Sequence, residues 1–236
     1  MELSEIRKLA GQAEGFLTDK EGELLYHLAK NCRGEGVIVE IGSWKGRSTI
    51  WLGHGSKASK QVKIYAIDPH TGATEQKQVY ENIWTFEEFK KNVQTAKVEN
   101  LVCPIVKTSA EAARDFNLPI ELIFIDGAHE YEAVRLDFDL WYPQVIEGGI
   151  MAFHDTIWNE GPKRVVKELV YKSRNFRRIG LVDYITYAQK VRQNSFFDRV
   201  RNRYLLLWRN VYEVAWKLRL PKPIRKAAKR VLKFVQ

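Results

Sequence analysis

The stretch "VIVEIGSWKGRST" (residues 37–49) decides how this chain folds, because a strand of the buried type runs directly into a turn that contains glycine. Its first residues are β-branched and apolar, and it then passes Glu40, Gly42 and Gly46 before a short polar run. In an open parallel sheet, such a turn lets backbone N–H groups approach a ligand at the carboxyl end of the first strand. We therefore expect a ligand site at this turn.

The same pattern of a short apolar run that ends in a turn recurs along the chain. The runs lie at residues 37–42, 62–68, 101–107, 120–127 and 148–155. Segments long enough for helices separate them, and the clearest of these, with apolar residues at helical spacing, lie at 18–30, 86–98 and 131–146. The alternation predicts a Rossmann-like, doubly wound α/β fold with a mostly parallel sheet.

Some helix ends can be read directly from the sequence. Thr18 and Glu21 have the spacing of a capping box, which predicts that a helix starts there. Gly148 and Gly149 follow the segment 131–146 and are expected to end its helix.

The chain after the fifth run predicts a different sheet edge. Residues 177–182 and 184–190 have strand composition and meet at Asp183 with no room for a helix between them. This predicts an antiparallel hairpin at the edge of a seven-stranded sheet. Composition changes near residue 190, so we expect a domain over residues 1–190 and a basic amphipathic helical tail over 191–236.

Cysteine content and hydropathy indicate the cellular compartment in which the protein is expected. Only Cys32 and Cys103 are present, far apart, so neither a disulfide framework nor a thiolate zinc site is expected. The first residues lack an apolar signal core, and the longest strongly apolar run near the end, residues 204–208, is too short to span a bilayer. We expect a cytoplasmic protein.

Charge is distributed unevenly along the chain. Residues 1–160 carry 17 basic and 25 acidic side chains, whereas residues 161–236 carry 21 basic and 4 acidic ones. In the tail, apolar residues at alternating steps of three and four form one helical stripe: Phe197, Val200, Tyr204, Leu207, Val211, Val214 and Leu218.

The last residues of the tail predict a partner. Beyond Pro221 and Pro223, residues 224–235 have the pattern of a basic amphipathic helix, which suits peripheral attachment to an anionic membrane on its inner face. Packing of the first tail helix on the domain or in a homodimer, with a solvated end, is the alternative. Nucleic acid is disfavoured because no recognised binding motif accompanies the charge.

The glycine turn also limits the choice of ligand. A dinucleotide fingerprint requires G-x-G-x-x-G, whereas Trp44 occupies the place of the middle glycine here. Glu40 suits a positively charged group, and Asp68, at the end of the second strand, is placed to accept hydrogen bonds from ribose hydroxyls. S-adenosylmethionine combines a nucleoside with sulfonium and ammonium groups. The alternative is a buried acid beside a structural turn.

The sequence resembles the class I S-adenosylmethionine-dependent methyltransferases. The resemblance rests on "VEIGSWKGRST", "AIDPH" and the longer "FIDGAHEYEAVRLDFDLWYPQVIEGGIMAFHDT", and it covers residues 17–188. The long segment is similar to the signature of macrolide-sugar O-methyltransferases and cephalosporin hydroxylase-like proteins, the methyltransferase family 24 type.

This resemblance implies roles for particular residues. The methionine end of the cofactor would lie at Glu40, Gly42, Ser43 and Gly46. Asp68 would bind the ribose, and Asp126 would close the site. The adenine would lie at Ser109 and Ala110.

A hydroxyl acceptor must lose its proton, either to a positioned base or through a divalent cation. Asp126 and Asp155 end adjacent strands and suit Mg²⁺; His154 would favour Mn²⁺ if it also binds. A core role for His154, and capping of the helix near Gly161 by Asp155, are the alternatives. His129 is placed as a general base, with capping as its alternative.

These observations together predict an S-adenosylmethionine-dependent O-methyltransferase. The resemblance implies a sugar hydroxyl of a glycan or glycosylated metabolite as the acceptor, with divalent metal assistance as an open question. Two rivals remain. One is a noncatalytic membrane-associated protein on the same fold, and the other is a different enzyme such as an NAD-dependent reductase or a metal-dependent hydroxylase.

Overall fold

A computed structural model describes residues 1–72 and 83–218 of the chain. Its centre is one seven-stranded sheet in the order β3-β2-β1-β4-β5-β7-β6, in which β7 runs in the direction opposite to the other six strands. The strands are β1 Val37–Ile41, β2 Ile64–Ile67, β3 Val102–Ile105, β4 Ile120–Ile125, β5 Val145–Phe153, β6 Phe176–Val182 and β7 Ile185–Lys190. The predicted fold is confirmed: a mostly parallel, Rossmann-like sheet with an antiparallel edge hairpin.

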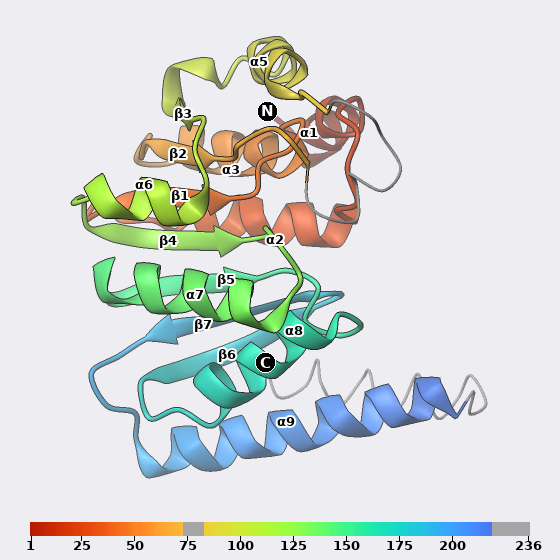
Figure 1. Cartoon of the computed structure of the whole chain (residues 1–236), viewed down its shortest axis with the longest axis vertical. Coiled ribbons are helices and arrows are strands. Elements are labelled where there is room, and N and C mark those ends of the chain that lie inside the picture. The colour runs from red at the N-terminus through yellow and green to blue at the C-terminus, as the bar shows by residue number, and fades with distance from the viewer. Residues whose placement is uncertain (73–82, 219–236) are drawn as a thin grey trace.

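Helices pack on both faces of this sheet (Figure 1). One face carries α1 Leu3–Ala10, α2 Asp19–Lys30, α3 Arg47–Lys57 and α5 Phe86–Thr95. The other carries α6 Ser109–Asp115, α7 Tyr131–Trp141, α8 Glu160–Val165 with a π-helical turn Val166–Tyr171, and α9 Phe196–Lys217. Short 3₁₀ turns lie at Glu99–Leu101 and Tyr142–Gln144. None of the helices in the described part of the chain is both long and apolar enough to cross a bilayer.

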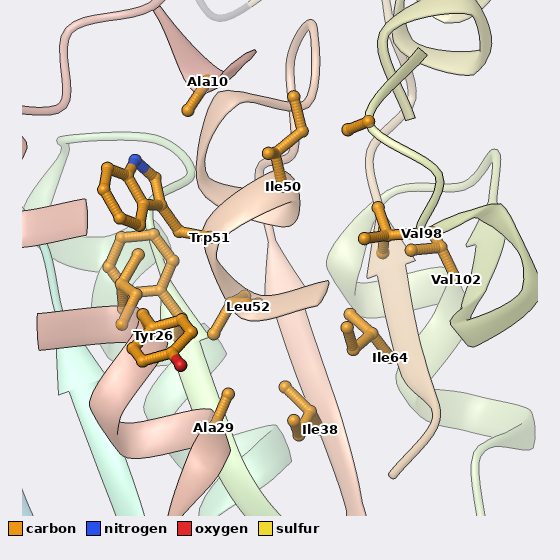
Figure 2. Packing of buried hydrophobic residues seen from close by; sticks show 14 of the residues in the cluster. Ala10, Tyr26, Ala29, Ile38, Ile50, Trp51, Leu52, Ile64, Val98 and Val102 are labelled. Carbon is orange, nitrogen blue, oxygen red and sulfur yellow. The ribbon is translucent and has the colours of Figure 1, made fainter. Parts of the chain in front are cut away.

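Successive residues of the central strands pack into two separate hydrophobic cores, one on each face of the sheet. Ile38 and Ile64 belong to the core on the face of α2 and α3, and Figure 2 shows Leu52 and Ala29 near Ile38, with Trp51 and Tyr26 farther out in the same cluster. The neighbouring residue Val39 belongs to the core on the opposite face. Because both faces are covered, the central strands are predominantly apolar rather than alternating, as the sequence indicated, with Glu40 and Glu121 as the buried acids among them.

The end of α7 differs from the expected one. The helix stops at Trp141 because Pro143 follows in a 3₁₀ turn, and β5 already begins at Val145. Gly148 therefore lies inside β5, with φ 86°, where the pairing with β4 shifts register. The prediction that Gly148 and Gly149 end the helix was wrong, since the glycines accommodate an irregularity in the strand.

The edge hairpin forms as predicted. β6 and β7 pair antiparallel from Phe176 opposite Lys190 to Val182 opposite Ile185. Asp183, in the tight connection between them, has φ 44°, a conformation that Asp tolerates better than most residues. β7 pairs with β5, and β6 forms the outer edge.

The long helix α9 packs along β6 and the π-helical turn (Figure 1). Leu205 and Leu206 join the core that α7 and β5 share. The predicted stripe lies on another side of the helix and is exposed, from 40% at Val211 to 82% at Phe197. The helix is as predicted, but the face that packs on the domain is not the apolar stripe. Residues 224–235, with their predicted helix, lie outside the described residues, and the boundary at residue 190 stays a prediction.

Candidate active site

A cavity of about 850 Å³ lies at the carboxyl ends of the parallel strands. Loops after four adjacent strands line it: Gly42 and Ser43 after β1, Asp68 after β2, Asp126 to His129 after β4, and His154 and Asp155 at the end of β5. Ser109 and Ala110, at the start of α6, complete the wall on another side. This is where an open α/β sheet places its ligand, and the volume suits a small-molecule site.

The turn after β1 requires its glycine. Gly42 has φ 85°, and a Cβ there would lie 2.1 Å from the carbonyl oxygen of Asp126. The two loops that flank the cavity therefore touch through backbone alone, and any side chain at Gly42 would separate them. Gly46, with φ 88°, precedes the first turn of α3 and packs on Phe89 rather than lining the cavity.

Glu40 lies behind the cavity wall. Its carboxyl is fully buried and accepts a hydrogen bond from Thr49 at 2.5 Å, while its second oxygen has no hydrogen-bond partner within the described chain. Burial raises the pKa of Glu40 to about 7, against the opposing effect of hydrogen bonds from Ser48 and Thr49. Direct contact of Glu40 with a ligand stays a prediction.

Asp68 shapes the cavity by binding two loops. One of its oxygens accepts from the backbone N–H of Trp44 at 2.7 Å, and the other accepts from that of His70 at 2.6 Å. The carboxylate is buried but reaches the cavity wall. Each carboxylate oxygen accepts more than one bond, so the expected ribose contact remains compatible with this structural role.

At the far end of the cavity, Ser109 links two elements. Its hydroxyl accepts from the indole N–H of Trp141 at 2.8 Å, and Asp137 lies within hydrogen-bonding reach of it. Asp137 is 7% exposed, and burial raises its pKa to about 6. Sequence reasoning missed Asp137, although an acid among Val134, Phe138 and Trp141 on the buried face of a helix is a recognisable signal.

Asp126, His154 and Asp155 meet in one cluster. His154 Nδ1 lies 3.0 Å from an oxygen of Asp126 and 3.3 Å from one of Asp155. The same oxygen of Asp155 lies 3.0 Å from Nε2 of His129. The adjacency of β4 and β5 brings the two aspartates together, as the sequence predicted.

The cluster has a fifth member that the sequence did not reveal. Glu21, fully buried on α2, places a carboxylate oxygen 3.6 Å from Nε2 of His154. The capping box of Thr18 and Glu21 forms as predicted, and Glu21 also accepts from the backbone N–H of Tyr184 at 2.7 Å. Glu21 therefore joins α2 and the edge hairpin to the site, which its capping role alone did not indicate.

Opposite charges set the ionisation of the cluster. Burial disfavours the cation of His154, but attraction to Asp126, with contacts to Asp155 and Glu21, outweighs it and raises its pKa. For Asp155, burial is outweighed by contacts to His129 and His154, so its pKa is lowered. Burial leaves the pKa of Asp126 raised, despite the opposing effect of His154.

The alternative capping role of Asp155 is excluded. Asn159, and not Asp155, stands at the N-cap of α8. Asp155 instead has φ 55° where the chain leaves β5, and its carboxylate is engaged by the two histidines. Elsewhere in the cavity wall, the loop of Glu14 to Leu17 had no motif to identify it, and Trp44 and Arg47, although inside the glycine-turn motif, were not predicted as site residues.

Two comparisons of sequence found matches. A family model described as "Methyltransferase domain" matches residues 39–156. An uncharacterised protein of Acanthamoeba polyphaga mimivirus, R132, is 29% identical over 141 residues, which cover 56% of this chain. The match spans 59% of that relative's own length.

Solved structures share the fold. The O-methyltransferase NovP superposes with a TM-score of 0.67 at 18% identity, over 80% of this chain and 98% of that one. TomG of Streptomyces achromogenes, an O-methyltransferase of tomaymycin synthesis in complex with S-adenosylmethionine, has a TM-score of 0.58 at 17% identity, over 80% of this chain and 89% of that one. At these identities the likeness concerns the architecture of the chain.

Proposed function

The chain belongs to the methyltransferase domain family, and on that premise we propose that it transfers the methyl group of S-adenosylmethionine to a hydroxyl oxygen of an acceptor. The methionine end of the cofactor lies against Gly42 and Ser43, with Glu40 and Gly46 behind them. Asp68 binds the ribose. Ser109 and Ala110 enclose the adenine.

One observation supports this proposal most strongly. The cluster of Asp126, His154 and Asp155 lines the same cavity as the turn at Gly42. Gly42 contacts the backbone of Asp126 directly, and Asp126 belongs to the cluster with His154 and Asp155. Methyl transfer is an in-line displacement that requires the acceptor oxygen to be aligned with the methyl carbon. A cluster beside the reacting end of the cofactor is where an acceptor hydroxyl would lose its proton.

His129 is the residue that we assign as general base. Its Nε2 lies 3.0 Å from the Asp155 carboxylate, and its side chain is 25% exposed at the cavity wall. A carboxylate in that position orients the imidazole and stabilises the cation that forms when the ring takes a proton. Asp126 and His154 would hold the acceptor and the charge around it.

The same cluster offers a set of ligand atoms that could bind a divalent cation. One atom each from Asp126, His154 and Asp155 lies within 4.8 Å of the others, and the buried Nδ1 of His154 makes no aligned hydrogen bond to any described residue. Two carboxylates and a neutral imidazole suit Mn²⁺, or Mg²⁺ with water completing the shell, so a bound cation would take the place of the proton that these carboxylates favour on His154. A bound cation would lower the pKa of the acceptor hydroxyl.

The class of acceptor rests on the sequence resemblance. It favours a sugar hydroxyl of a glycan or of a glycosylated metabolite. Peripheral attachment to an anionic membrane through residues 222–236 would bring the enzyme to membrane-assembled glycans, and these residues lie outside the described ones. A homodimer through the first tail helix is the alternative use of the tail.

The proposal is tested with the full chain, labelled methyl donor and a panel of glycosides and glycans. We expect label on an acceptor oxygen, loss of turnover in excess chelator, and recovery on adding Mn²⁺ or Mg²⁺. Asp155→Asn should abolish that recovery, whereas Asp115→Asn, an exposed carboxylate paired with Lys107, should not.

Two results would change the assignment. Unchanged turnover in chelator would remove the metal and leave His129 as the base, and His129→Ala should then slow turnover roughly 10²- to 10⁴-fold. Label on no member of the panel, while the chain still binds the cofactor, would contradict the acceptor class.

A further inference from the structure

An apolar stripe runs along the exposed side of α9 and continues to Leu218, the residue directly after the helix. We call the seven residues that form it the α9 stripe: Phe197, Val200, Tyr204, Leu207, Val211, Val214 and Leu218. Every one of them is exposed, by at least 40%. A contiguous apolar surface of this kind is unusual on a monomer and marks an interaction site.

The helix cannot turn this stripe inward, because polar contacts fix its other face. Asn202, fully buried, donates to the carbonyl of Phe176 at 3.0 Å. Arg209, 1% exposed, donates to the carbonyl of Thr156. Rotation of α9 would place apolar side chains against the carbonyls of Phe176 and Thr156, which would then be buried without a donor.

Charges beside the stripe argue against a second copy as its partner. The spacing of three and four would allow two α9 helices to pair. The positions that would flank such a seam include Arg201, Arg203 and Lys217, and none of the flanking positions is acidic. The acids of α9 are engaged within the chain: Asp198 bonds Ser195, and Glu213 bonds Lys163 and Lys217. Self-pairing would bring like charges together.

The chain beyond α9 strengthens the same argument. Residues 219–236 carry seven basic side chains and no acidic one. An apolar stripe with basic neighbours, followed by a basic segment, complements a surface that has an apolar interior and a negatively charged outer layer. That is the chemistry of an anionic lipid headgroup layer.

We propose that the α9 stripe is a docking face that lies flat in the headgroup layer of an anionic membrane. A helix of 22 residues presents a stripe about 33 Å long to the surface. Apolar side chains enter the upper acyl region, while the neighbouring Arg203 and Lys217 remain among the phosphates. The docking face is thus part of the folded domain and does not depend on residues 222–236 alone.

The test is co-sedimentation of the full chain with vesicles of phosphatidylglycerol and phosphatidylcholine, and with vesicles of phosphatidylcholine alone. One variant carries Leu207→Gln and Val211→Gln in the stripe. The matched control carries Val106→Gln and Leu118→Gln, two exposed apolar residues elsewhere. We expect binding to the anionic vesicles, roughly tenfold or more weaker for the stripe variant because two apolar side chains no longer enter the lipid. The control should bind as the unmodified chain does, and all three should share one melting temperature.

Three outcomes would overturn the proposal. Equal binding by the stripe variant would assign attachment to residues outside α9. Equal binding to neutral vesicles would remove the role of lipid charge. No vesicle binding by the unmodified chain would leave the stripe to a second copy or an acidic protein, and analytical ultracentrifugation would identify the first by a dimer that the stripe variant loses.

Discussion

Asp137 places an ionisable carboxyl group in the wall of the cavity, where only 7% of the residue is exposed to solvent. Its pKa is raised to about 6 by burial, although the hydrogen bond with Ser109 acts in the opposite direction. In the unfolded chain an aspartate has a pKa of about 3.9. At a pH between these two pKa values, Asp137 is ionised in the unfolded chain but still protonated in the folded one. The free energy of unfolding therefore falls as the pH rises through this range.

This difference gives a prediction for Asp137→Asn. The variant cannot ionise, so its free energy of unfolding relative to the unmodified chain should increase by about 2 to 3 kcal/mol from pH 4 to pH 7.5. Urea unfolding at the two pH values measures the change. Asp139→Asn, on the exposed side of the same helix, is the control. A difference that does not vary with pH would show that Asp137 ionises normally in the folded chain.

Single residues divide into those that the sequence could identify and those that it could not. Asp126 and Asp155 follow apolar strands, so their position at the carboxyl edge of the sheet could be predicted. Glu21 and Asp137 lie on helices, and their approach to the site depends on how those helices pack. The apolar neighbours of Asp137 indicate that it is buried, but no spacing along the chain indicates that Asp137 or Glu21 approaches the site.

Helix α9 is joined to the active-site loop by one buried side chain. Arg209 donates to the carbonyl of Thr156, the residue after Asp155, and lies 5.6 Å from the ring of Tyr171. Thr156 also bonds β7, through its hydroxyl contact to Thr186 at 2.7 Å. The tail helix and the edge hairpin therefore hold the same short segment.

Arg209→Ala should reveal this connection. It leaves a buried carbonyl without its donor and a space beside Tyr171, so we expect a loss of about 2 to 4 kcal/mol in the free energy of unfolding. Arg203→Ala, exposed on the same helix, should change it by about 0.5 kcal/mol or less. Equal values for the two variants, from urea unfolding, would mean that α9 contributes little to the domain.

The orientation of α9 also shows where pattern reading fails at the level of an element. The sequence predicted the apolar stripe but left open whether the domain or a second subunit covers it. The packed face contains Asn202 and Arg209, whose polar groups are satisfied by the carbonyls of Phe176 and Thr156. Those carbonyls belong to segments distant in sequence, so their availability could not be anticipated.

For the molecule as a whole, the alternation of buried strands and helices was sufficient to predict the fold. Covered on both faces, the parallel strands must be apolar, and the sequence shows that directly. The location of the site followed from the same rule, because strand ends meet at one edge of the sheet. Other parts of the cavity wall, such as the loop of Glu14 to Leu17, do not follow a strand. Their position depends on tertiary contacts, which produce no periodic pattern in the sequence.

The central claim is that the cavity beside Gly42 binds S-adenosylmethionine, and titration calorimetry of the full chain tests it most directly. We predict binding of one molecule of S-adenosylmethionine or of its demethylated product, and no heat with NADH. Asp68→Ala should weaken binding roughly 10- to 100-fold through lost hydrogen bonds to a charged group. No heat with S-adenosylmethionine or with its demethylated product, or tighter binding of NADH, would contradict this claim.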